Sequence, residues 1–267
     1  MKKGCIIYNV HKSLAYEIYK DSLIYFEKKN IEILPIEECN SADFIVVIGG
    51  DGTLLRALKK FINNTDPHII AINAGNLGFL TEIMAENFVE LYEDYFNGDF
   101  KYEERYILEM NFNGRNYYAL NEICISKYNA NSKVLRTQFV SNEEYMCTYK
   151  SDGVIISTPT GSTAYSMSAG GPIVKSNMKA IIITPLAPHN LNTRPIVIEG
   201  SEKLEVSLID EDSSGIFIVD GQVSEKLSYT DTLYIEYTDK KLKLIVPKGR
   251  NYYSILREKL KWGDNLC

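Results

Sequence analysis

The sequence predicts two domains, an α/β amino-terminal domain with a Rossmann-like parallel sheet and an all-β carboxyl-terminal domain built as a β-sandwich. Strand-like and helix-like patterns alternate over residues 1–100, which favours a parallel sheet covered by helices on both faces. After Asp99 the helical period disappears, and short alternating runs separated by turn residues follow. We therefore place the first domain at 1–100 and the second at 101–251, with a last helix within 252–267 packing back on the first.

Each element of the first domain is predicted from the spacing of its apolar residues. Short β-branched runs predict strands, whereas apolar residues three and four positions apart predict amphipathic helices. Asn97-Gly98 is a typical carboxyl cap for the third helix. The expected strands are Ile6–Asn9, Ile31–Leu34, Phe44–Ile48 and Ile69–Asn73, and the expected helices are Leu14–Lys29, Leu54–Ile62 and Phe88–Phe96.

The second domain is predicted from closely spaced strands. Asn113-Gly114 between two alternating runs is a strong signal for a two-residue hairpin turn. The final helix is expected over Tyr252–Trp262, with its leucine and isoleucine side chains on one side. The expected strands are Tyr106–Phe112, Tyr117–Lys127, Leu135–Val140, Tyr145–Tyr149, Val154–Ser157, Ile181–Thr184, Leu204–Ile209, Ile216–Val219, Leu233–Tyr237 and Leu242–Val246.

The composition argues against several classes of function. A net charge of -6 is unlike that of nucleic-acid-binding proteins, which usually present a basic face. No apolar run approaches the roughly 18–20 residues of a membrane span, and the amino terminus becomes polar too soon for a signal peptide. We therefore expect a cytoplasmic protein with neither a membrane nor a nucleic acid as partner.

Cysteine and histidine residues are scattered along the chain. The five cysteines form no CxxC pair and lie mostly in apolar runs, so we expect reduced core thiols at Cys5, Cys39, Cys124, Cys147 and Cys267. The three histidines are too dispersed for a protein-built zinc site. We predict no metal ligands in the chain.

The glycine-rich turn after the third expected strand is the most informative stretch. The apolar run Phe44–Ile48 ends in Gly49-Gly50-Asp51-Gly52-Thr53, directly before a helix. Such a turn lets backbone N–H groups approach a phosphate at the positive end of the helix. It also brings one carboxylate, Asp51, to that phosphate. We assign phosphate binding to Gly49, Gly50, Gly52 and Thr53, and expect a phosphotransferase or a nucleotide-binding protein.

The two best-known phosphate motifs do not fit this turn. A GxGxxG motif beginning at Gly50 would need glycine or alanine at position 55, where leucine stands, and GxxxxGK[ST] is absent. A plain strand–helix turn with Asp51 or Thr53 as the helix cap is the structural alternative. If the site is catalytic, we expect Asp51 to hydrogen-bond the attacking hydroxyl and to take its proton late.

Three segments of the second half are also candidates for ligand binding. Ser151–Pro172 is rich in small and hydroxylated residues and is suited to packing flat against a base or a ribose, although an ordinary polar loop has the same composition. Asn121-Glu122 offers acceptors for the vicinal hydroxyls of a ribose, or is a solvent-facing pair within a strand. Asp220-Gly221-Gln222 is by default a hairpin turn.

Together these motifs closely resemble those of bacterial ATP-NAD kinases, the enzymes that make NADP. The glycine–aspartate motif is shared with diacylglycerol, sphingosine and 6-phosphofructo-kinases. Thr160–Tyr165 together with Asn121-Glu122 is, by resemblance, specific to NAD kinases. The resemblance covers nearly the whole chain, in order, through Gly49–Thr53, Asn73–Leu80, Asn121-Glu122, Ser151–Gly153, Thr158–Tyr165, Ser168–Pro172, Thr184-Pro185, Pro188-His189, Arg194-Pro195 and Asp220–Gln222.

The resemblance implies magnesium-dependent transfer of the γ-phosphoryl group of ATP to the 2′-hydroxyl of the adenosine ribose of NAD. It implies a homo-oligomer, a dimer or a tetramer, with NAD held between the domains and between subunits. In this resemblance Asp51 accepts the ribose proton and Phe79 covers the dinucleotide. The other implied NAD contacts are Gly52, Asn121, Glu122, Lys150, Asp152, Thr163, Ala164, Tyr165, Ser166, Met167, Ser168, Ala187 and Gln222. The family usually has arginine where this chain has Lys150, so a point charge replaces a planar fork there.

Two other functions stay open on the sequence. One is a lipid kinase that uses the same turn, although the chain has no basic amphipathic stretch suited to a membrane surface. The other is a non-catalytic module that senses NAD or NADP. The expected metal is magnesium or another divalent cation, bound mainly through the phosphates of ATP.

Overall fold

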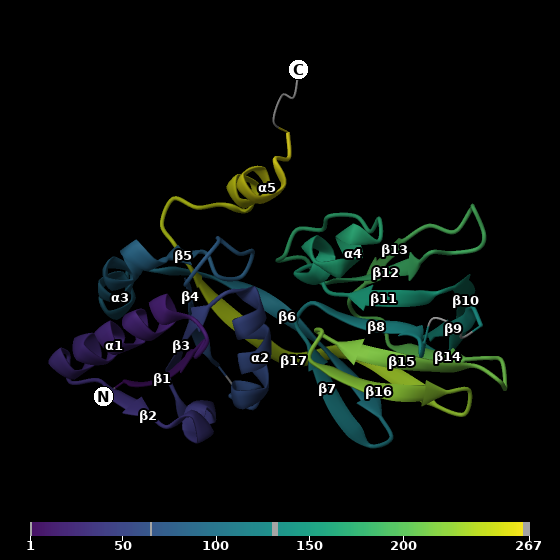
Figure 1. The fold of residues 1–267 in the computed structure, drawn as a ribbon, viewed down its shortest axis with the longest axis horizontal. Helices are drawn as coiled ribbons and strands as arrows, with labels where there is room; N and C mark the ends of the chain where they lie inside the picture. The colour runs from purple at the N-terminus through teal and green to yellow at the C-terminus, as the bar shows by residue number, and fades with distance from the viewer. Residues whose placement is uncertain (1, 65, 130–132, 264–267) are drawn as a thin grey trace. The chain divides into compact units, whose positions relative to one another are not determined.

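The computed structural model describes residues 2–64, 66–129 and 133–263. The chain divides into two compact units (Figure 1). Unit 1 contains Met1–Glu104 and Leu242–Cys267, and unit 2 contains Arg105–Lys241. Within the described ranges, no helix is both long enough and apolar enough to cross a membrane.

Unit 1 is a parallel sheet covered by helices (Figure 1). Its strands lie in the order β4-β3-β1-β2 and are all parallel. The last residues of β17 pair with the start of β4, and β5 pairs with the end of β4. The elements are β1 (Lys3–Tyr8), α1 (Ser13–Lys28), β2 (Glu32–Leu34), η1 (Ile36–Ser41), β3 (Phe44–Gly49), α2 (Asp51–Phe61), β4 (His68–Asn73), β5 (Ile83–Met84), η2 (Ala85–Asn87), α3 (Phe88–Phe96) and α5 (Tyr252–Leu260).

The core of unit 1 explains why these segments take these forms. Strand β3 is buried at all six positions, as expected for a central strand with helices on both faces. Helix α2 buries Leu54, Ala57, Leu58 and Phe61, which lie on one face at helical spacing. Helices α1 and α3 contribute Phe26 and Tyr92 to an apolar cluster that does not include the α2 side chains. Every second residue of β3 and β4 belongs to this cluster. The sheet is therefore held rigidly, and its strand ends are fixed positions for a site.

Unit 2 is an antiparallel β-sandwich, which confirms the predicted fold class. One sheet has the order β13-β12-β11-β8-β15-β16, and the other contains β10-β9-β14-β17 with the hairpin β6-β7. Asn113 and Gly114 both have positive φ, as the predicted two-residue turn between β6 and β7 requires. The elements are β6 (Lys101–Phe112), β7 (Arg115–Ala119), β8 (Glu122–Lys127), β9 (Leu135–Ser141), β10 (Glu144–Ser151), β11 (Gly153–Ser157), η3 (Gly161–Thr163), α4 (Tyr165–Ser168), β12 (Ala180–Leu186), β13 (Ile196–Glu199), β14 (Leu204–Leu208), β15 (Ser214–Val219), β16 (Val223–Ser228) and β17 (Thr232–Val246).

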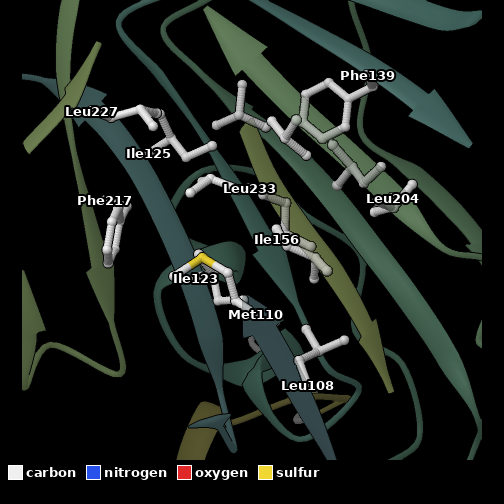
Figure 2. Packing of buried hydrophobic residues seen from close by; sticks show 14 of the residues in the cluster. Leu108, Met110, Ile123, Ile125, Phe139, Ile156, Leu204, Phe217, Leu227 and Leu233 are labelled. Carbon is white, nitrogen blue, oxygen red and sulfur yellow. The ribbon is translucent and has the colours of Figure 1, made fainter. Parts of the chain in front are cut away.

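The sandwich core lies between the inward faces of the two sheets. Figure 2 shows members of this apolar cluster, with Ile123, Ile156 and Phe217 from one sheet and Phe139 and Leu204 from the other. All five side chains are at most 1% exposed. Strand β11 is buried at all five positions and β8 at Ile123, Cys124 and Ile125, so the centre of this sheet is covered on both faces.

Three strand predictions were wrong in detail. The expected strand Tyr117–Lys127 is two strands, β7 and β8, because the chain turns at Leu120-Asn121. The expected strands Leu233–Tyr237 and Leu242–Val246 are one strand, β17, which stays extended through the polar residues between them. The strands β13 and β16 were not predicted, since both are sheet edges with few buried side chains and so lack the apolar pattern of the interior strands.

The cysteines differ in part from expectation. Cys5 and Cys39 are joined by a disulfide with a Cα–Cα distance of 5.5 Å, so the prediction of reduced thiols was wrong for this pair. Cys124 and Cys147 are free thiols, and burial raises the pKa of Cys124 to about 12. Cys267 lies outside the described residues.

Candidate active site

The glycine-rich turn connects β3 to α2, with Gly50 as the amino cap and Asp51 as the first helical residue. Thr53 closes the turn, since its backbone N–H donates to the Gly50 carbonyl at 2.7 Å and its hydroxyl accepts from the Gly50 N–H at 3.4 Å. Thr53 is 6% exposed. The Thr53 hydroxyl therefore caps the start of α2, as expected for a plain strand–helix turn.

Asp51 is held by four hydrogen bonds from the loop that follows β4. Its Oδ1 accepts from the backbone N–H groups of Leu80 and Thr81, at 3.1 and 3.0 Å, and from the Thr81 hydroxyl at 3.0 Å. Among the described residues, its Oδ2 accepts from the Phe79 N–H alone, at 2.8 Å. An ionised carboxylate has about four lone-pair positions, two on each oxygen. Oδ2 is therefore the oxygen with room for a further donor.

The loop residues are fixed in turn by close packing around this carboxylate. Asn73 is 2% exposed at the end of β4, and its amide nitrogen donates to the Thr81 hydroxyl at 2.9 Å and to the Asn76 carbonyl at 2.7 Å. A Cβ on Gly78 would lie 1.9 Å from Asp51 Oδ1, so only glycine permits this approach. The motif Asn73–Leu80 thus orients Asp51, and Phe79, near the end of the motif, is half-buried.

Gly50 and Gly52 have a different environment from Gly78. A Cβ on Gly50 would meet no atom within 4 Å, and one on Gly52 would meet only Arg56 Nη1, at 3.7 Å. Neither has a positive φ. Packing within unit 1 therefore does not require glycine at these two positions. The open space beside the first N–H groups of an eleven-residue helix is suited to the close approach of a phosphate.

In unit 2, Asn121-Glu122 lies at the turn between β7 and β8, which Asp220 fixes. The Asp220 carboxylate accepts from the backbone N–H groups of Leu120, Asn121 and Glu122 at 2.8, 2.8 and 3.0 Å. Asp220 and Gly221 both have positive φ, so the predicted hairpin turn is present between β15 and β16. Burial raises the pKa of Asp220 to about 6, although the three N–H groups act in the opposite direction.

Glu122 is a partly buried acid with an available acceptor. Burial, together with the nearby Asp220 carboxylate, raises the pKa of Glu122 to about 7, against the effect of a hydrogen bond from the Tyr165 backbone. Its Oε2 is buried without a partner among the described residues, as are Ser157 Oγ and Thr160 Oγ1. Glu122 and Ser157 face each other across β8 and β11. Because buried polar atoms are usually hydrogen-bonded, three orphans at one end of these strands point to an absent ligand or water.

The small-residue segment after β11 packs directly on this turn. The Thr158 backbone N–H donates to the Asn121 carbonyl at 2.9 Å, and its hydroxyl donates to the Leu120 carbonyl at 2.6 Å. The segment then forms η3 and the short helix α4. It therefore brings the expected contacts Thr163, Ala164 and Tyr165 close to Asn121-Glu122. Tyr165 is 49% exposed.

The remaining expected contacts on this side differ in accessibility. Ser166 is fully buried, and its hydroxyl lies 2.9 Å from that of Thr184, so it is a packing residue and its side chain is not presented to a ligand. Met167 is half-buried, and Ser168 is exposed. Gln222 follows the Asp220 turn and is exposed, with its amide donating to the Asp220 carbonyl at 3.2 Å.

Lys150, Asp152 and Ala187 lie at the opposite end of β11 from Glu122. Glu122 pairs with Ser157, whereas the Asp152 N–H donates to Leu186 just before Ala187. At about 3.3 Å per strand residue, Asp152 is roughly 16 Å from Ser157 along the strand. The expected contacts of unit 2 therefore lie in two separate regions of the subunit, which the sequence did not predict.

Some residues of these regions were missed by the sequence interpretation. Lys127 forms an ion pair with Asp152 at 2.9 Å, and nothing in the local pattern marked it. Asp220 was interpreted only as a turn residue, although it positions Asn121-Glu122 from 98 or more positions away. In unit 1, Lys12 was also missed. Its position in the loop after the first strand was the one sequence signal that placed it near the glycine turn.

The described part of the chain contains no group of three or more histidine, cysteine, aspartate or glutamate side chains that could hold a metal ion. Magnesium commonly binds through substrate phosphates and keeps several waters.

Unit 1 has a glycine–aspartate turn at the start of α2, and unit 2 has a buried carboxylate oxygen without a partner among the described residues at the start of β8. This combination is typical of a nucleotide-dependent phosphotransferase. The family model of the ATP-NAD kinase N-terminal domain matches residues 10–100 of the sequence. The family model of the ATP-NAD kinase C-terminal domain matches residues 120–246. The chain belongs to the NAD kinase family.

Curated relatives match over the whole chain. It is 46% identical to the NAD kinase of Fusobacterium nucleatum, with all of both chains covered, and 35% identical to that of Caldicellulosiruptor saccharolyticus, with 95% of this chain and 97% of the relative covered. Among solved structures, an NAD kinase from Archaeoglobus fulgidus in complex with ATP has a TM-score of 0.78 at 28% identity, covering 96% of this chain and 98% of that one. Yeast NADH kinase complexed with NADH has a TM-score of 0.92 at 20% identity, covering 100% and 89%, which shows the shared fold.

Proposed function

We propose that the chain transfers the γ-phosphoryl group of ATP to the 2′-hydroxyl of the adenosine ribose of NAD, giving NADP and ADP. Membership of the NAD kinase family supports this activity and does not favour a lipid kinase or a sensing module. The observation that carries the chemistry is Asp51, whose Oδ2 accepts a single hydrogen bond while Oδ1 accepts three.

In the proposed reaction, Asp51 Oδ2 accepts a hydrogen bond from the ribose 2′-hydroxyl. The hydroxyl oxygen attacks the γ-phosphorus, a new P–O bond forms, and the bond from the γ-phosphorus to the β,γ-bridging oxygen breaks. The proton passes to Asp51 late in the transfer, and ADP leaves. Phosphoryl transfer depends mainly on alignment and charge stabilisation, so a rigidly oriented carboxylate is well suited to it.

The donor is proposed to be MgATP, with its phosphates beside Gly49–Thr53. The space beside these glycines supports this assignment, because among the described atoms a Cβ on Gly50 would meet none within 4 Å and one on Gly52 only Arg56 Nη1. The magnesium ion neutralises charge on the phosphates, and the turn supplies backbone N–H groups at the start of α2. Thr53 contributes by closing the turn, since its hydroxyl is engaged with Gly50.

NAD is proposed to bind mainly to unit 2. Asn121 and Glu122 accept from ribose hydroxyls, and the unpartnered Glu122 Oε2 supports this role. Thr163, Ala164, Tyr165 and Ser168 hold the adenine end, with Met167 and Gln222 at the margin. Phe79 and Gly52 contact the dinucleotide from unit 1.

We also propose a homo-oligomer, in line with the dimer or tetramer that the family resemblance implies. Lys150, Asp152 and Ala187 lie at the start of β11. Glu122 lies beside Ser157 at the other end of that strand, five residues after Asp152. Two contact regions on one subunit are expected where each NAD is shared between neighbouring subunits. A cytoplasmic location is proposed from the substrates, although the Cys5–Cys39 disulfide does not favour it, because disulfides are rare in reducing compartments.

A coupled assay for NADP tests this function. The protein is supplied with MgATP and NAD, with diacylglycerol and fructose 6-phosphate as competing acceptors, and NADP is measured with an NADP-specific dehydrogenase. We expect NADP to be the phosphorylated product. Phosphorylation of either competing acceptor in place of NAD, or saturable NAD binding with no NADP formed, would overturn the proposal.

A further inference from the structure

Lys12 is a cation at the edge of the unit 1 sheet that no carboxylate of the described residues neutralises. It lies in the loop between β1 and α1, and its side chain is half-buried. Its Nζ donates to the Ala74 carbonyl at 3.2 Å. An ammonium carries three donors. Two N–H groups of Lys12 are therefore left for a ligand or for water.

The loop that carries Lys12 is attached to the strand that ends in the glycine turn. The Asn9 N–H donates to the Ile48 carbonyl at 2.9 Å, and the Ala74 N–H donates to the Gly49 carbonyl at 2.9 Å. The Lys12 ammonium bonds to Ala74, which bonds to Gly49 in turn. The carboxyl ends of parallel strands lie at one edge of a sheet, where ligands of such folds bind. Two successive hydrogen bonds, through Ala74, therefore connect Lys12 to Gly49, the first glycine of the turn.

The position of the ammonium depends on Gly75. A Cβ on Gly75 would lie 2.8 Å from Lys12 Nζ and 3.9 Å from Asn73 Oδ1. Gly75 does not have a positive φ, so its backbone would accept alanine. A methyl group at this position would therefore displace the Lys12 ammonium, which is the end of a flexible side chain.

Asn73 Oδ1 is a buried acceptor close to Lys12, and it takes a donor such as water, because a phosphoryl oxygen has no hydrogen to give. Asn73 is 2% exposed, and its Oδ1 has no partner among the described residues. Its amide nitrogen is fully used by Asn76 and Thr81. The Lys12 ammonium, with two spare donors, and this acceptor therefore both lie near the position that a Cβ on Gly75 would take. Buried acceptors of this kind are usually satisfied by water or by a ligand.

We propose that Lys12 is a phosphate-anchoring residue, whose ammonium binds a phosphoryl oxygen of the MgATP donor. The assignment rests on the proposed function and adds a residue to it. Lysine contacts phosphate as a compact point charge, so Lys12 would attract the terminal phosphates without fixing their orientation. Orientation is left to the N–H groups of the turn, and Asp51 receives the ribose proton.

Four variants test this assignment. Lys12→Met removes the charge and Lys12→Arg keeps it, while Gly75→Ala displaces the ammonium through its methyl group. Lys20→Met is the matched control, because Lys20 lies on α1, directly after the loop that carries Lys12, and its 44%-exposed side chain pairs with Glu17 at 2.7 Å. The readouts are kcat/KM for MgATP and for NAD, calorimetric binding of the magnesium complex of a non-hydrolysable ATP analogue and of NAD, and thermal unfolding.

We expect Lys12→Met to lower kcat/KM for MgATP by about 10- to 100-fold, the effect of losing a hydrogen bond to a charged group. The affinity for the ATP analogue should fall in parallel, with the NAD dissociation constant within about twofold of wild type. Lys12→Arg should retain most activity, Gly75→Ala should show a smaller loss in the same direction, and Lys20→Met should equal wild type. The double variant Lys12→Met with Gly75→Ala should lose no more than Lys12→Met alone, because both changes act on one ammonium.

Three results would overturn the proposal. These are unchanged analogue affinity in Lys12→Met, a loss of NAD affinity in place of ATP affinity, and full additivity in the double variant. Should Lys12→Met unfold, Gly75→Ala with wild-type analogue affinity would overturn it equally. If the wild-type protein forms no NADP, the proposed function fails, whereas calorimetry with the analogue still decides the role of Lys12.

Discussion

Two neighbouring glycines of the turn give opposite predictions when each is replaced by alanine. A Cβ on Gly50 meets no atom within 4 Å, and the φ of -113° suits alanine. Gly50→Ala should leave the free energy of unfolding unchanged or raise it by roughly 0.4–1 kcal/mol, because alanine restricts the unfolded chain. A Cβ on Gly49 lies 2.3 Å from the buried Thr53 hydroxyl. Gly49→Ala should therefore lower that free energy by about 1–3 kcal/mol through overpacking.

The same pair of variants separates catalysis from stability. In Gly50→Ala the methyl group occupies the space through which we expect a phosphate to approach α2. We expect kcat/KM for MgATP to fall by about 10- to 100-fold, equivalent to roughly 1.5–3 kcal/mol of lost interaction. The affinity for NAD should stay within about twofold of wild type, since unit 2 is proposed to supply most of its contacts.

The assay combines urea denaturation with steady-state formation of NADP at varied MgATP. Gly49→Ala serves as the control for a change in the same turn that acts through folding. A Gly50→Ala protein with wild-type kcat/KM for MgATP would refute the reasoning that this glycine leaves room for a phosphate. A Gly50→Ala protein as unstable as Gly49→Ala would refute the packing argument.

Three further predictions concern the acids and the loop that positions them. Burial holds the pKa of Glu122 at about 7, above its ordinary 4.5, so this group favours folding at low pH and the benefit is lost as pH rises through 7. Glu122→Gln should therefore reduce the fall in unfolding free energy between about pH 5 and 7, and an unchanged slope in urea titrations would contradict a buried acid. Asp220→Asn should lower the free energy of unfolding by about 1–3 kcal/mol, because an amide NH2 group would face one of three backbone N–H donors. The same variant should weaken NAD binding in calorimetry. Wild-type values of both would contradict the role of Asp220 in holding the Asn121-Glu122 turn. Gly78→Ala would place a Cβ 1.9 Å from Asp51 Oδ1, so kcat should fall by about 100-fold or more as the carboxylate is displaced; wild-type kcat in the NADP assay would refute this packing.

The sequence allowed a good prediction where the signal is local. The run Phe44–Ile48 is apolar because β3 is buried on both faces, and three glycines directly after it mark a turn that backbone or ligand approaches closely. Asn113-Gly114 likewise predicts its hairpin from two residues, because both must adopt positive φ. Such features depend on neighbours in the chain and on burial of whole segments.

Features that depend on distant residues were not predictable in this way. The break at Leu120-Asn121 is set by the Asp220 carboxylate, about a hundred residues further along the chain. Lys12 acquires its position through Ala74 and Gly75, which sequence spacing does not connect to it. The exposed edge strands β13 and β16 lack an apolar pattern, because pairing on one side holds them in place. Chemistry-bearing residues were easy to name, whereas the residues that position them were not.

The central claim is that Asp51 takes the proton of the ribose hydroxyl, and kcat of Asp51→Asn tests it most directly. The amide cannot accept a proton, and it presents a donor to the Phe79 N–H or to the three donors at Oδ1. Urea denaturation and NAD calorimetry on the same sample separate the two effects. We predict that kcat falls by about 10²–10⁴-fold, the usual contribution of a general base, with NAD affinity within about threefold of wild type and a loss of roughly 1–3 kcal/mol in the free energy of unfolding. A folded Asp51→Asn protein that binds NAD and retains wild-type kcat would contradict the account.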